Sequence, residues 1–144
     1  MKIELTRRYS FAASHRLAHP RFTEEENRRL YGKCANPYGH GHNYVLEVTV
    51  AGPVDATTGM VANLADLDGF VQREVLDVFD HVYLNEQIEA FRPESGGQVP
   101  TTENLCIEIF RRLQPFPFAR LCRVRLEETG RNSFEYAGQA SRRP

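Results

Sequence analysis

The N-terminal part of the chain alternates between apolar and polar residues. Across residues 2–15 the apolar positions recur at almost every second residue: Ile3, Leu5, Tyr9, Phe11 and Ala13. Side chains two residues apart point to the same face of a strand, so this period predicts a strand with one buried face. Arg7 interrupts the apolar face, which predicts a bulge or a solvated end at that position.

Two further segments show the same alternation. Residues 43–50 carry apolar side chains at every second position: Tyr44, Leu46, Val48 and Val50. A connection over residues 52–59 follows, and Met60–Val61 is predicted to resume the sheet briefly. Near the C-terminus, Leu121–Glu128 and Ser133–Gly138 are predicted to form a hairpin.

Three helices are predicted between these strands. Thr23 and Glu26 have the spacing of a capping box for a short helix that ends near Leu30 or Tyr31. A longer helix is predicted over residues 64–79 with Asn63 as its cap, and another begins after Thr101 or Thr102 and ends at Pro115. The long helices each carry an apolar stripe at spacings of three and four: Leu64, Leu67, Val71, Val75 and Val78 in the first, and Leu105, Ile109 and Leu113 in the second.

This order of elements predicts an α+β fold. Strands with one apolar face need a covering layer, and two long helices on one face of a four-stranded antiparallel sheet supply it. The chain has 144 residues, so residues 1–144 are predicted to form a single domain.

Composition and charge exclude several classes of partner. The formal net charge is -1, which gives no support for nucleic-acid or anionic-membrane binding. No run of about 18 apolar residues suggests a membrane span, and the first residues lack the apolar centre of a secretory signal. Three cysteines, an odd number without framework spacing, argue against a disulfide scaffold. We therefore expect a cytoplasmic protein.

The segment from Gly39 to Tyr44 carries the clearest chemical pattern. His40 and His42 lie two residues apart in predicted extended backbone, on the face assigned to the interior. His15 lies on the inward face of the first strand and meets this pair if the two strands are antiparallel. Three neutral imidazoles suit a catalytic zinc ion with an open fourth position. An isolated His-x-His pair is a weak motif, however, and the alternative is histidines packed in a core.

Cys34 precedes His40 by six residues and follows Lys33. A neighbouring cation favours the thiolate, so Cys34 is predicted to have a lowered thiol pKa and to act as a nucleophile or base. Cys106 and Cys122 occur within apolar patterns and are predicted to be small core residues.

Several carboxylates are further candidates. Asp80–His81 ends the first long helix and is either an exposed terminus or a carboxylate–imidazole pair that exchanges protons with Cys34. Glu128 shares the inward face of its strand and needs a polar partner, whereas Glu127 is predicted to pair with arginine on the other face. Glu103 either favours the helix N-terminus or lines a pocket.

Taken together, these residues resemble the 6-pyruvoyltetrahydropterin synthases and their bacterial relatives, the 6-carboxytetrahydropterin synthases. The resemblance runs in family order over about residues 8–138. Its pieces are the segments 11–17, 31–44, 58–61, 63–67, 80–81, 84–85, 100–104 and 128–129. It implies the tunnelling fold, in which subunits assemble into a β-barrel and trimers stack into a homohexamer with active sites at subunit interfaces.

The same resemblance implies the chemistry. Zinc would be bound by His15, His40 and His42, and Cys34 would be the thiolate that abstracts a proton from 7,8-dihydroneopterin triphosphate. Asp80 and His81 are similar to the acid/base partners of that thiolate. Glu128 resembles the carboxylate that anchors the pterin, with Thr102 and Glu103 in the same region. Arg16 and Lys33 are expected to steer the triphosphate on charge and position alone.

Two products are compatible with the family. The gap of six residues between Cys34 and His40 resembles the animal-type enzymes, which favours loss of triphosphate to give 6-pyruvoyltetrahydropterin. The alternative is 6-carboxytetrahydropterin for the queuosine pathway, and a third hypothesis is a non-catalytic zinc- or pterin-binding module. The chain departs from the family at Asp68, where lysine is usual, and in a longer loop over Arg92–Val99.

Overall fold

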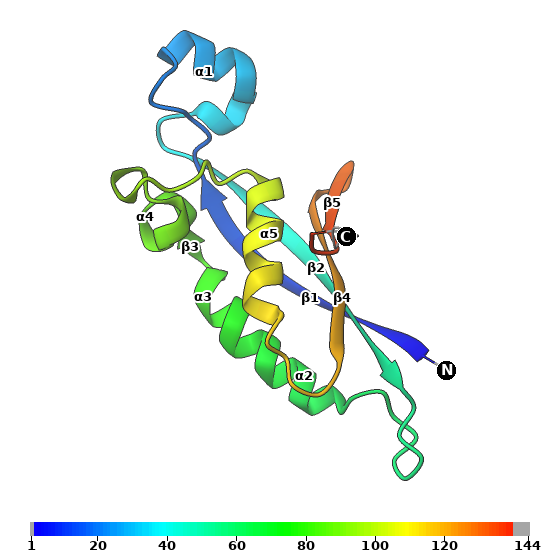
Figure 1. Ribbon diagram of the computed structural model, residues 1–144. Helices are drawn as coiled ribbons and strands as arrows, with labels where there is room; N and C mark the ends of the chain where they lie inside the picture. Colours follow the sequence, from blue (N-terminus) through cyan, green and yellow to red (C-terminus); the bar gives the residue numbers. More distant parts are fainter. Residues whose placement is uncertain (1, 140–144) are drawn as a thin grey trace, which may run out of the picture.

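An open sheet forms the framework of the protein, seen here in a computed structural model that describes residues 2–139. Its strand order is β3-β1-β2-β4-β5 (Figure 1). β1 (Lys2–His15) and β2 (His40–Pro53) pair antiparallel along their whole length, so that His15 lies opposite His40. β4 (Arg120–Thr129) pairs antiparallel with β2, and β5 (Asn132–Tyr136) with β4. The predicted antiparallel pairing of the first two strands is confirmed.

The sheet has five strands, and the prediction of four was wrong. The additional strand, β3 (Val82–Tyr83), pairs in parallel with Ala13 and Ser14 of β1. Two residues are too few to show an alternating pattern, so no periodicity marked this strand. Three short helical turns follow it: α4 (Leu84–Gln87), η3 (Glu89–Phe91) and η4 (Pro93–Ser95).

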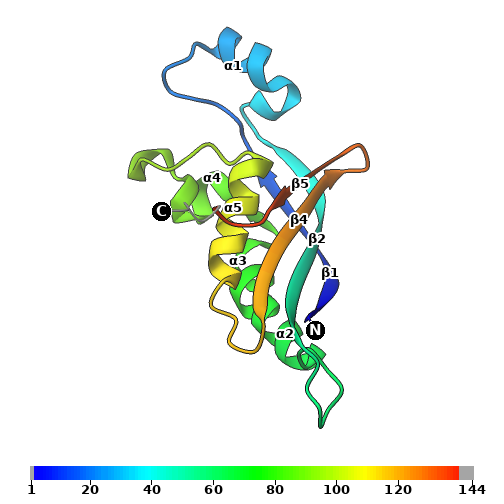
Figure 2. The same ribbon diagram turned by 45° about the vertical axis from the view of Figure 1, so that its right-hand side comes forward.

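The long helices cover one face of the sheet (Figures 1 and 2). They are α5 (Thr102–Leu113) and a continuous helical segment made of α2 (Leu64–Val71), η2 (Gln72–Leu76) and α3 (Asp77–Phe79). The predicted caps are confirmed: Asn63 accepts a hydrogen bond from the amide of Ala65 at 2.8 Å, and Thr101 from that of Asn104 at 3.2 Å. Among residues 2–139, no helix combines the length and apolar character needed to cross a membrane.

Between the helices and the sheet lies the apolar core. Fully buried side chains come from both layers: Tyr44, Leu46, Leu67, Phe79, Leu105, Ile109, Leu113 and Leu126. Burying each large apolar side chain contributes about 1.5–3 kcal/mol relative to exposure. The opposite face of the sheet is polar; there Thr6 and Thr49 are hydrogen bonded at 2.7 Å and Arg123 pairs with Glu4 at 2.9 Å.

The helical segment over residues 64–79 differs from its prediction at two positions, because Leu64 is 39% exposed and the buried side shifts by one residue at the C-terminal end. Its middle turn, η2, is a π-helix, and Phe79 is fully buried where Val78 was predicted to be. The buried residues of this segment recur at intervals of four: Leu67, Val71, Val75 and Phe79. In a regular α-helix each such interval rotates the side chain by about 40° past a full turn. The wider π turn reduces this drift and keeps Phe79 facing the sheet.

Two strand predictions were also wrong. Cys122 is half-buried and not a core residue, because a bulge in β4 changes the register between Thr49↔Arg123 and Val50↔Leu121. The extra residue moves Leu121 into the buried position. Met60 and Val61 form no strand. They follow a turn in which Asp55 accepts hydrogen bonds from two backbone amides.

The N-terminal end of β1 is solvated, as one of the two predicted alternatives has it, since Ile3 is 51% exposed and the Arg7 side chain 43%. Arg7 itself causes no bulge. It keeps its place in the β1–β2 ladder and reaches α2, where it donates two hydrogen bonds to Asp68 at 3.0 and 2.9 Å. The hydroxyl of Tyr9 donates a third at 2.8 Å. Asp68, the residue that departs from the family pattern, therefore connects the first strand to the first long helix.

We expect Asp68→Asn to lower the free energy of unfolding by about 1 kcal/mol, because it removes one ion of a bidentate pair that is about 40% exposed. The hydrogen bonds from Arg7 and Tyr9 hold the pKa of the Asp68 carboxyl below its usual value. Their contribution is therefore complete above the unfolded-state pKa and is lost as pH falls through the folded-state pKa. Urea unfolding should show a wild-type advantage near neutral pH that disappears in acid. An advantage that persists unchanged in acid would contradict this account.

Candidate metal and thiol centre

The histidines meet where β1 ends and β2 begins. His15 is fully buried, and its ring lies 5.0 Å from that of His42, while the rings of His40 and His42 are 4.7 Å apart. Because the two strands are paired in register up to His15↔His40, the inward faces of both strands present these side chains to the same space.

His15 is held in one tautomer. Its Nδ1 lies 2.8 Å from the carbonyl oxygen of Pro100, which can only accept, so Nδ1 carries the hydrogen. The other ring nitrogen, Nε2, is buried and has no hydrogen-bond partner among residues 2–139, and the same is true of Nε2 in His42. Burial lowers the pKa of both imidazoles, which favours their neutral forms. Two neutral imidazoles with free lone pairs are suitable metal ligands.

Cys34 completes a group of three potential ligand atoms. It lies in η1 (Gly32–Ala35). Its Sγ, a ring nitrogen of His15 and a ring nitrogen of His42 all lie within 4.8 Å of one another. Nitrogen and sulfur donors at this spacing suit zinc. The sequence predicted His40 as the third ligand beside His15 and His42, whereas this group has Cys34 in that place, with the His40 ring next to His42.

The predicted effect of Lys33 on Cys34 is not found. Burial raises the pKa of the Cys34 thiol, and the negative charge of Glu128 raises it further. The Lys33 side chain is exposed and faces a separate pocket. Adjacency in sequence therefore does not place this ammonium group against the thiol.

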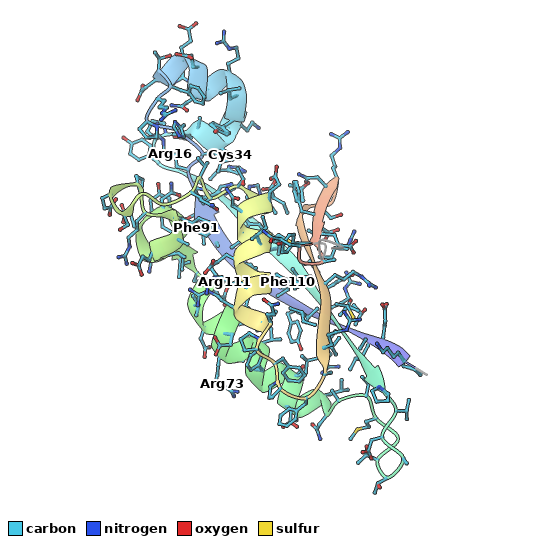
Figure 3. The ribbon with its side chains drawn as sticks, in the orientation of Figure 1. Arg16, Cys34, Arg73, Phe91, Phe110 and Arg111 are labelled. Atoms are coloured by element: carbon cyan, nitrogen blue, oxygen red, sulfur yellow. The ribbon has the colours of Figure 1, made fainter. Side chains whose placement is uncertain are left out.

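A set of hydrogen bonds holds the Cys34 turn against the end of β1. The amide of Leu17 donates to the carbonyl of Cys34 at 2.7 Å, and Nε of Arg16 donates to the carbonyl of Ala35 at 3.3 Å. Figure 3 labels Arg16 and Cys34 beyond the end of β1. The side chain of Asn85, in α4, exchanges two hydrogen bonds of 2.8 Å with the backbone of Arg16. Sequence patterns gave Asn85 no role beyond its place in a family motif.

Glu128 faces the histidines from β4. It accepts hydrogen bonds from the hydroxyl of Thr102 and from Asn132, and its Oε2 lies 3.8 Å from Nε2 of His42. Burial by itself raises the pKa of this carboxyl, but the hydrogen bonds from Thr102 and Asn132 and the nearby histidines lower it overall. Glu128 is therefore held as a carboxylate beside the candidate metal centre.

The structure also shows where three other residues considered in the sequence lie: Tyr44, Glu103 and Glu127. Tyr44 is fully buried and its hydroxyl has no hydrogen-bond partner among the described residues, so the residue assigned only to the core brings a polar group beneath His42. Glu103 is exposed in the first turn of α5, as expected for a residue that favours the helix N-terminus. Glu127 makes no ion pair within residues 2–139; Arg125 pairs instead with Glu47.

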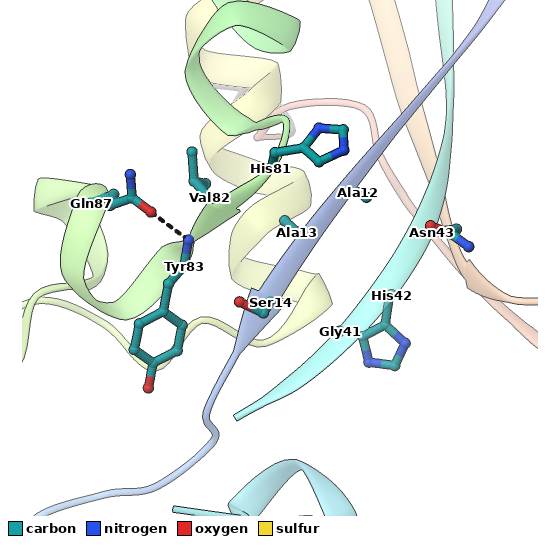
Figure 4. Close-up of a pocket in the computed structure, with 10 residues that line it drawn as sticks. All are labelled: Ala12, Ala13, Ser14, Gly41, His42, Asn43, His81, Val82, Tyr83 and Gln87. Atoms are coloured by element: carbon teal, nitrogen blue, oxygen red, sulfur yellow. Dashed lines mark hydrogen bonds between the residues drawn. The ribbon is translucent and has the colours of Figure 1, made fainter. Parts of the chain in front are cut away.

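Asp80 and His81 form a pair apart from the thiol. Oδ1 of Asp80 lies 2.9 Å from Nδ1 of His81 and accepts a hydrogen bond of 2.9 Å from the amide of Ala12. That amide and His81 lower the pKa of Asp80. The His81 backbone has a φ of 60°, and its side chain is 81% exposed. It lines a pocket of about 500 Å³ that also includes His42, Tyr83 and Gln87 but not Cys34 (Figure 4).

Comparisons with known proteins place nearly the whole chain among pterin synthases. The curated 6-pyruvoyl tetrahydrobiopterin synthase of Pongo abelii is 43% identical over 137 residues, which cover 94% of this chain and 92% of that protein. The 6-carboxy-5,6,7,8-tetrahydropterin synthase of Haemophilus influenzae is 30% identical over 122 residues, covering 73% of this chain and 84% of that protein. The solved structure of Caenorhabditis elegans 6-pyruvoyl tetrahydropterin synthase superposes with a TM-score of 0.86 at 38% identity, covering 96% of this chain and 97% of that one.

The family profile described as 6-pyruvoyl tetrahydropterin synthase matches residues 4–139. This match extends over the strands, the helices and every residue of the candidate centre. The chain belongs to the 6-pyruvoyl tetrahydropterin synthase family.

Proposed function

We propose that this chain is a zinc-dependent lyase that converts 7,8-dihydroneopterin triphosphate to 6-pyruvoyltetrahydropterin with loss of triphosphate. One observation carries the proposal: a ring nitrogen of His15, a ring nitrogen of His42 and the Cys34 thiol lie within 4.8 Å of one another, beside the Glu128 carboxylate. The buried Nε2 atoms of both histidines have no hydrogen-bond partner among residues 2–139. Buried polar atoms are costly unless something binds them, so this arrangement favours a bound cation.

His15 and His42 would hold the zinc ion, with His40 as the third ligand that the family implies. The bound ion would supply Lewis-acid polarisation of the side-chain hydroxyls of the substrate. The Pro100 carbonyl supports binding through the chain itself, because it orients His15 with Nε2 free.

Glu128 would bind the pterin ring of the substrate, and Cys34 would transfer protons. Glu128, an acceptor held by Thr102 and Asn132, would bind the donor groups of the pterin ring. Cys34 would take a proton from a side-chain carbon of the substrate and return one later. Its raised thiol pKa in the free chain means that the thiolate needs stabilisation by bound zinc or by a neighbouring group.

Asp80 and His81 would act as the acid/base partners of Cys34 from a neighbouring copy of the chain. Their exposed position in a pocket that does not include Cys34 supports a role across a subunit interface. The open edge of β1 supports assembly as well, because within residues 2–139 only Ala13 and Ser14 pair with a strand on that edge. We propose a homohexamer of two stacked trimers, located in the cytoplasm.

The choice of product is tested by supplying zinc-loaded protein with 7,8-dihydroneopterin triphosphate and identifying the products by mass. We expect 6-pyruvoyltetrahydropterin and free triphosphate, because the gap of six residues from Cys34 to His40 and the higher identity to relatives of that name favour this reaction. The second candidate function predicts 6-carboxytetrahydropterin instead. Unchanged substrate, with zinc and pterin still bound, would contradict both and favour a binding module.

A further inference from the structure

A second pocket borders His40 but includes none of His15, Cys34 and His42. It has a volume of about 470 Å³ and is lined by Arg28, Gly32, Lys33, Asn36, Pro37 and His40. Its walls come from α1 (Glu24–Tyr31), η1 and the start of β2. α1 lies beyond the end of the sheet, above the point where β1 ends (Figures 1 and 2).

We propose that this pocket binds an oligophosphate, with Arg28 and Lys33 as its principal ligands, and that it receives the triphosphate of the substrate. The proposal rests on the function proposed above for its choice of ligand. The pocket itself would bind any short phosphate chain of matching size, because its charge and hydrogen-bond donors recognise phosphate oxygens.

The charges of the pocket are uncompensated. No carboxylate lines it, and neither Arg28 nor Lys33 makes an ion pair with any of residues 2–139. Six other arginines do pair with carboxylates: Arg7, Arg8, Arg111, Arg112, Arg123 and Arg125. Two unpaired cations that line one concave site attract an anion, and a short phosphate chain carries several negative charges.

Asn36 adds a further hydrogen-bond donor to the wall of the pocket. Asn36 uses its Oδ1 to accept a hydrogen bond from the amide of Tyr38 at 3.2 Å, which leaves its amide nitrogen free to donate. Arg16, the other residue expected to steer the triphosphate, does not line this pocket and uses its Nε to hold the carbonyl of Ala35. The geometry therefore gives the phosphate-binding role to Arg28 with Lys33, and gives Arg16 the role of positioning the Cys34 turn.

The order of groups along β2 matches the order of groups in the substrate. Glu128 lies level with the start of the buried part of β2, since Glu127 pairs with Val45. His42 follows and then His40, which borders the cationic pocket. Four residues of strand span about 13 Å. A pterin bound at Glu128 would thus place its three-carbon side chain at the histidines and its triphosphate at Arg28 and Lys33.

The test is calorimetric titration of metal-loaded protein with inorganic triphosphate, with Arg29→Ala as the matched control. Arg29 is exposed in the same last turn of α1 but does not line the pocket. We expect Arg28→Ala to weaken triphosphate binding about tenfold, since a charge-assisted hydrogen bond contributes about that factor, and Arg29→Ala to change it less than twofold. Equal binding by wild type and Arg28→Ala would overturn the proposal, as would equal losses in the two variants.

Turnover separates this proposal from the proposed function. If the protein makes product while Arg28→Ala changes neither triphosphate binding nor the KM for the substrate, the pocket is refuted and the function stands. If no product forms but Arg28→Ala still weakens triphosphate binding, the pocket binds oligophosphate, and the proposed substrate is wrong. Binding of ATP more tightly than 7,8-dihydroneopterin triphosphate would overturn the assignment of the pocket to the substrate.

Discussion

Replacing Cys34 by alanine should lower the turnover of zinc-loaded protein by about 10³-fold, the middle of the range for removal of a general base. The side chain is the only thiol in the candidate centre, because Cys106 is a buried residue of α5 and Cys122 lies at the bulge of β4. Single-turnover assays with 7,8-dihydroneopterin triphosphate would measure the loss. Cys122→Ala is the matched control and should leave the rate unchanged.

Metal content decides which role Cys34 has. We expect Cys34→Ala to retain zinc, because His15, His40 and His42 remain as nitrogen donors at the junction of β1 and β2. Loss of zinc together with turnover would make Cys34 a ligand and not a base, which its position within 4.8 Å of both His15 and His42 would then explain. Metal analysis of the purified variant and wild type distinguishes these results.

The strands that carry the site could be predicted because their periodicity is strong and regular. Residues 2–15 and 43–50 alternate without insertion, and the pairing of His15 with His40 follows once both are taken as antiparallel neighbours. The same parity assigned Glu128 to the inner face, where it lies 3.8 Å from His42. Side-chain direction in a regular strand is a local property, so the sequence alone determines it.

The predictions of buried residues were wrong where one residue is inserted into a regular strand or helix. The bulge at Cys122 reverses the alternation in β4, and the π turn in the first long helix replaces Val78 by Phe79 in the core. An inserted residue changes which side chains face the neighbouring layer, and the apolar periodicity of one segment does not reveal where such an insertion occurs. The strand β3 was not predicted because it is only two residues long. It is defined by its hydrogen-bonded pairing with β1 and not by an alternation of apolar and polar residues.

The electrostatics of the site could not be predicted from neighbours in the sequence. Lys33 adjoins Cys34 along the chain, yet in the tight turn η1 Lys33 lines the pocket beside Arg28, whereas Cys34 faces the histidines. The pKa of the thiol is therefore set by burial and by Glu128, which is distant in sequence. The tautomer of His15 depends in the same way on Pro100, a contact between residues 85 positions apart.

Replacing Glu128 by glutamine should reduce kcat/KM by about 10²-fold, because the pterin loses a charged acceptor whose hydrogen bonds contribute about 1.5–3 kcal/mol. The variant keeps the size of the side chain, but its amide has one oxygen where the carboxylate has two. Thr102 and Asn132 both donate to the carboxylate, so the amide group would bring a donor against one of them. Steady-state kinetics with 7,8-dihydroneopterin triphosphate would measure the loss, together with binding of a pterin that lacks the side chain.

Glu127→Gln is the matched control, since Glu127 directly precedes Glu128 in β4 and its side chain lies on the other face of the sheet. Its partner in the β2–β4 pairing is Val45. It should change kcat/KM less than twofold and leave pterin binding intact, because its carboxylate neither pairs with an arginine among residues 2–139 nor faces the histidines. Equal losses in the two variants would mean that the effect arises from the net charge of the strand, and the assignment of Glu128 as the pterin anchor would be wrong. A loss confined to Glu128→Gln would show that strand parity, the simplest property of the sequence, selects the functional carboxylate.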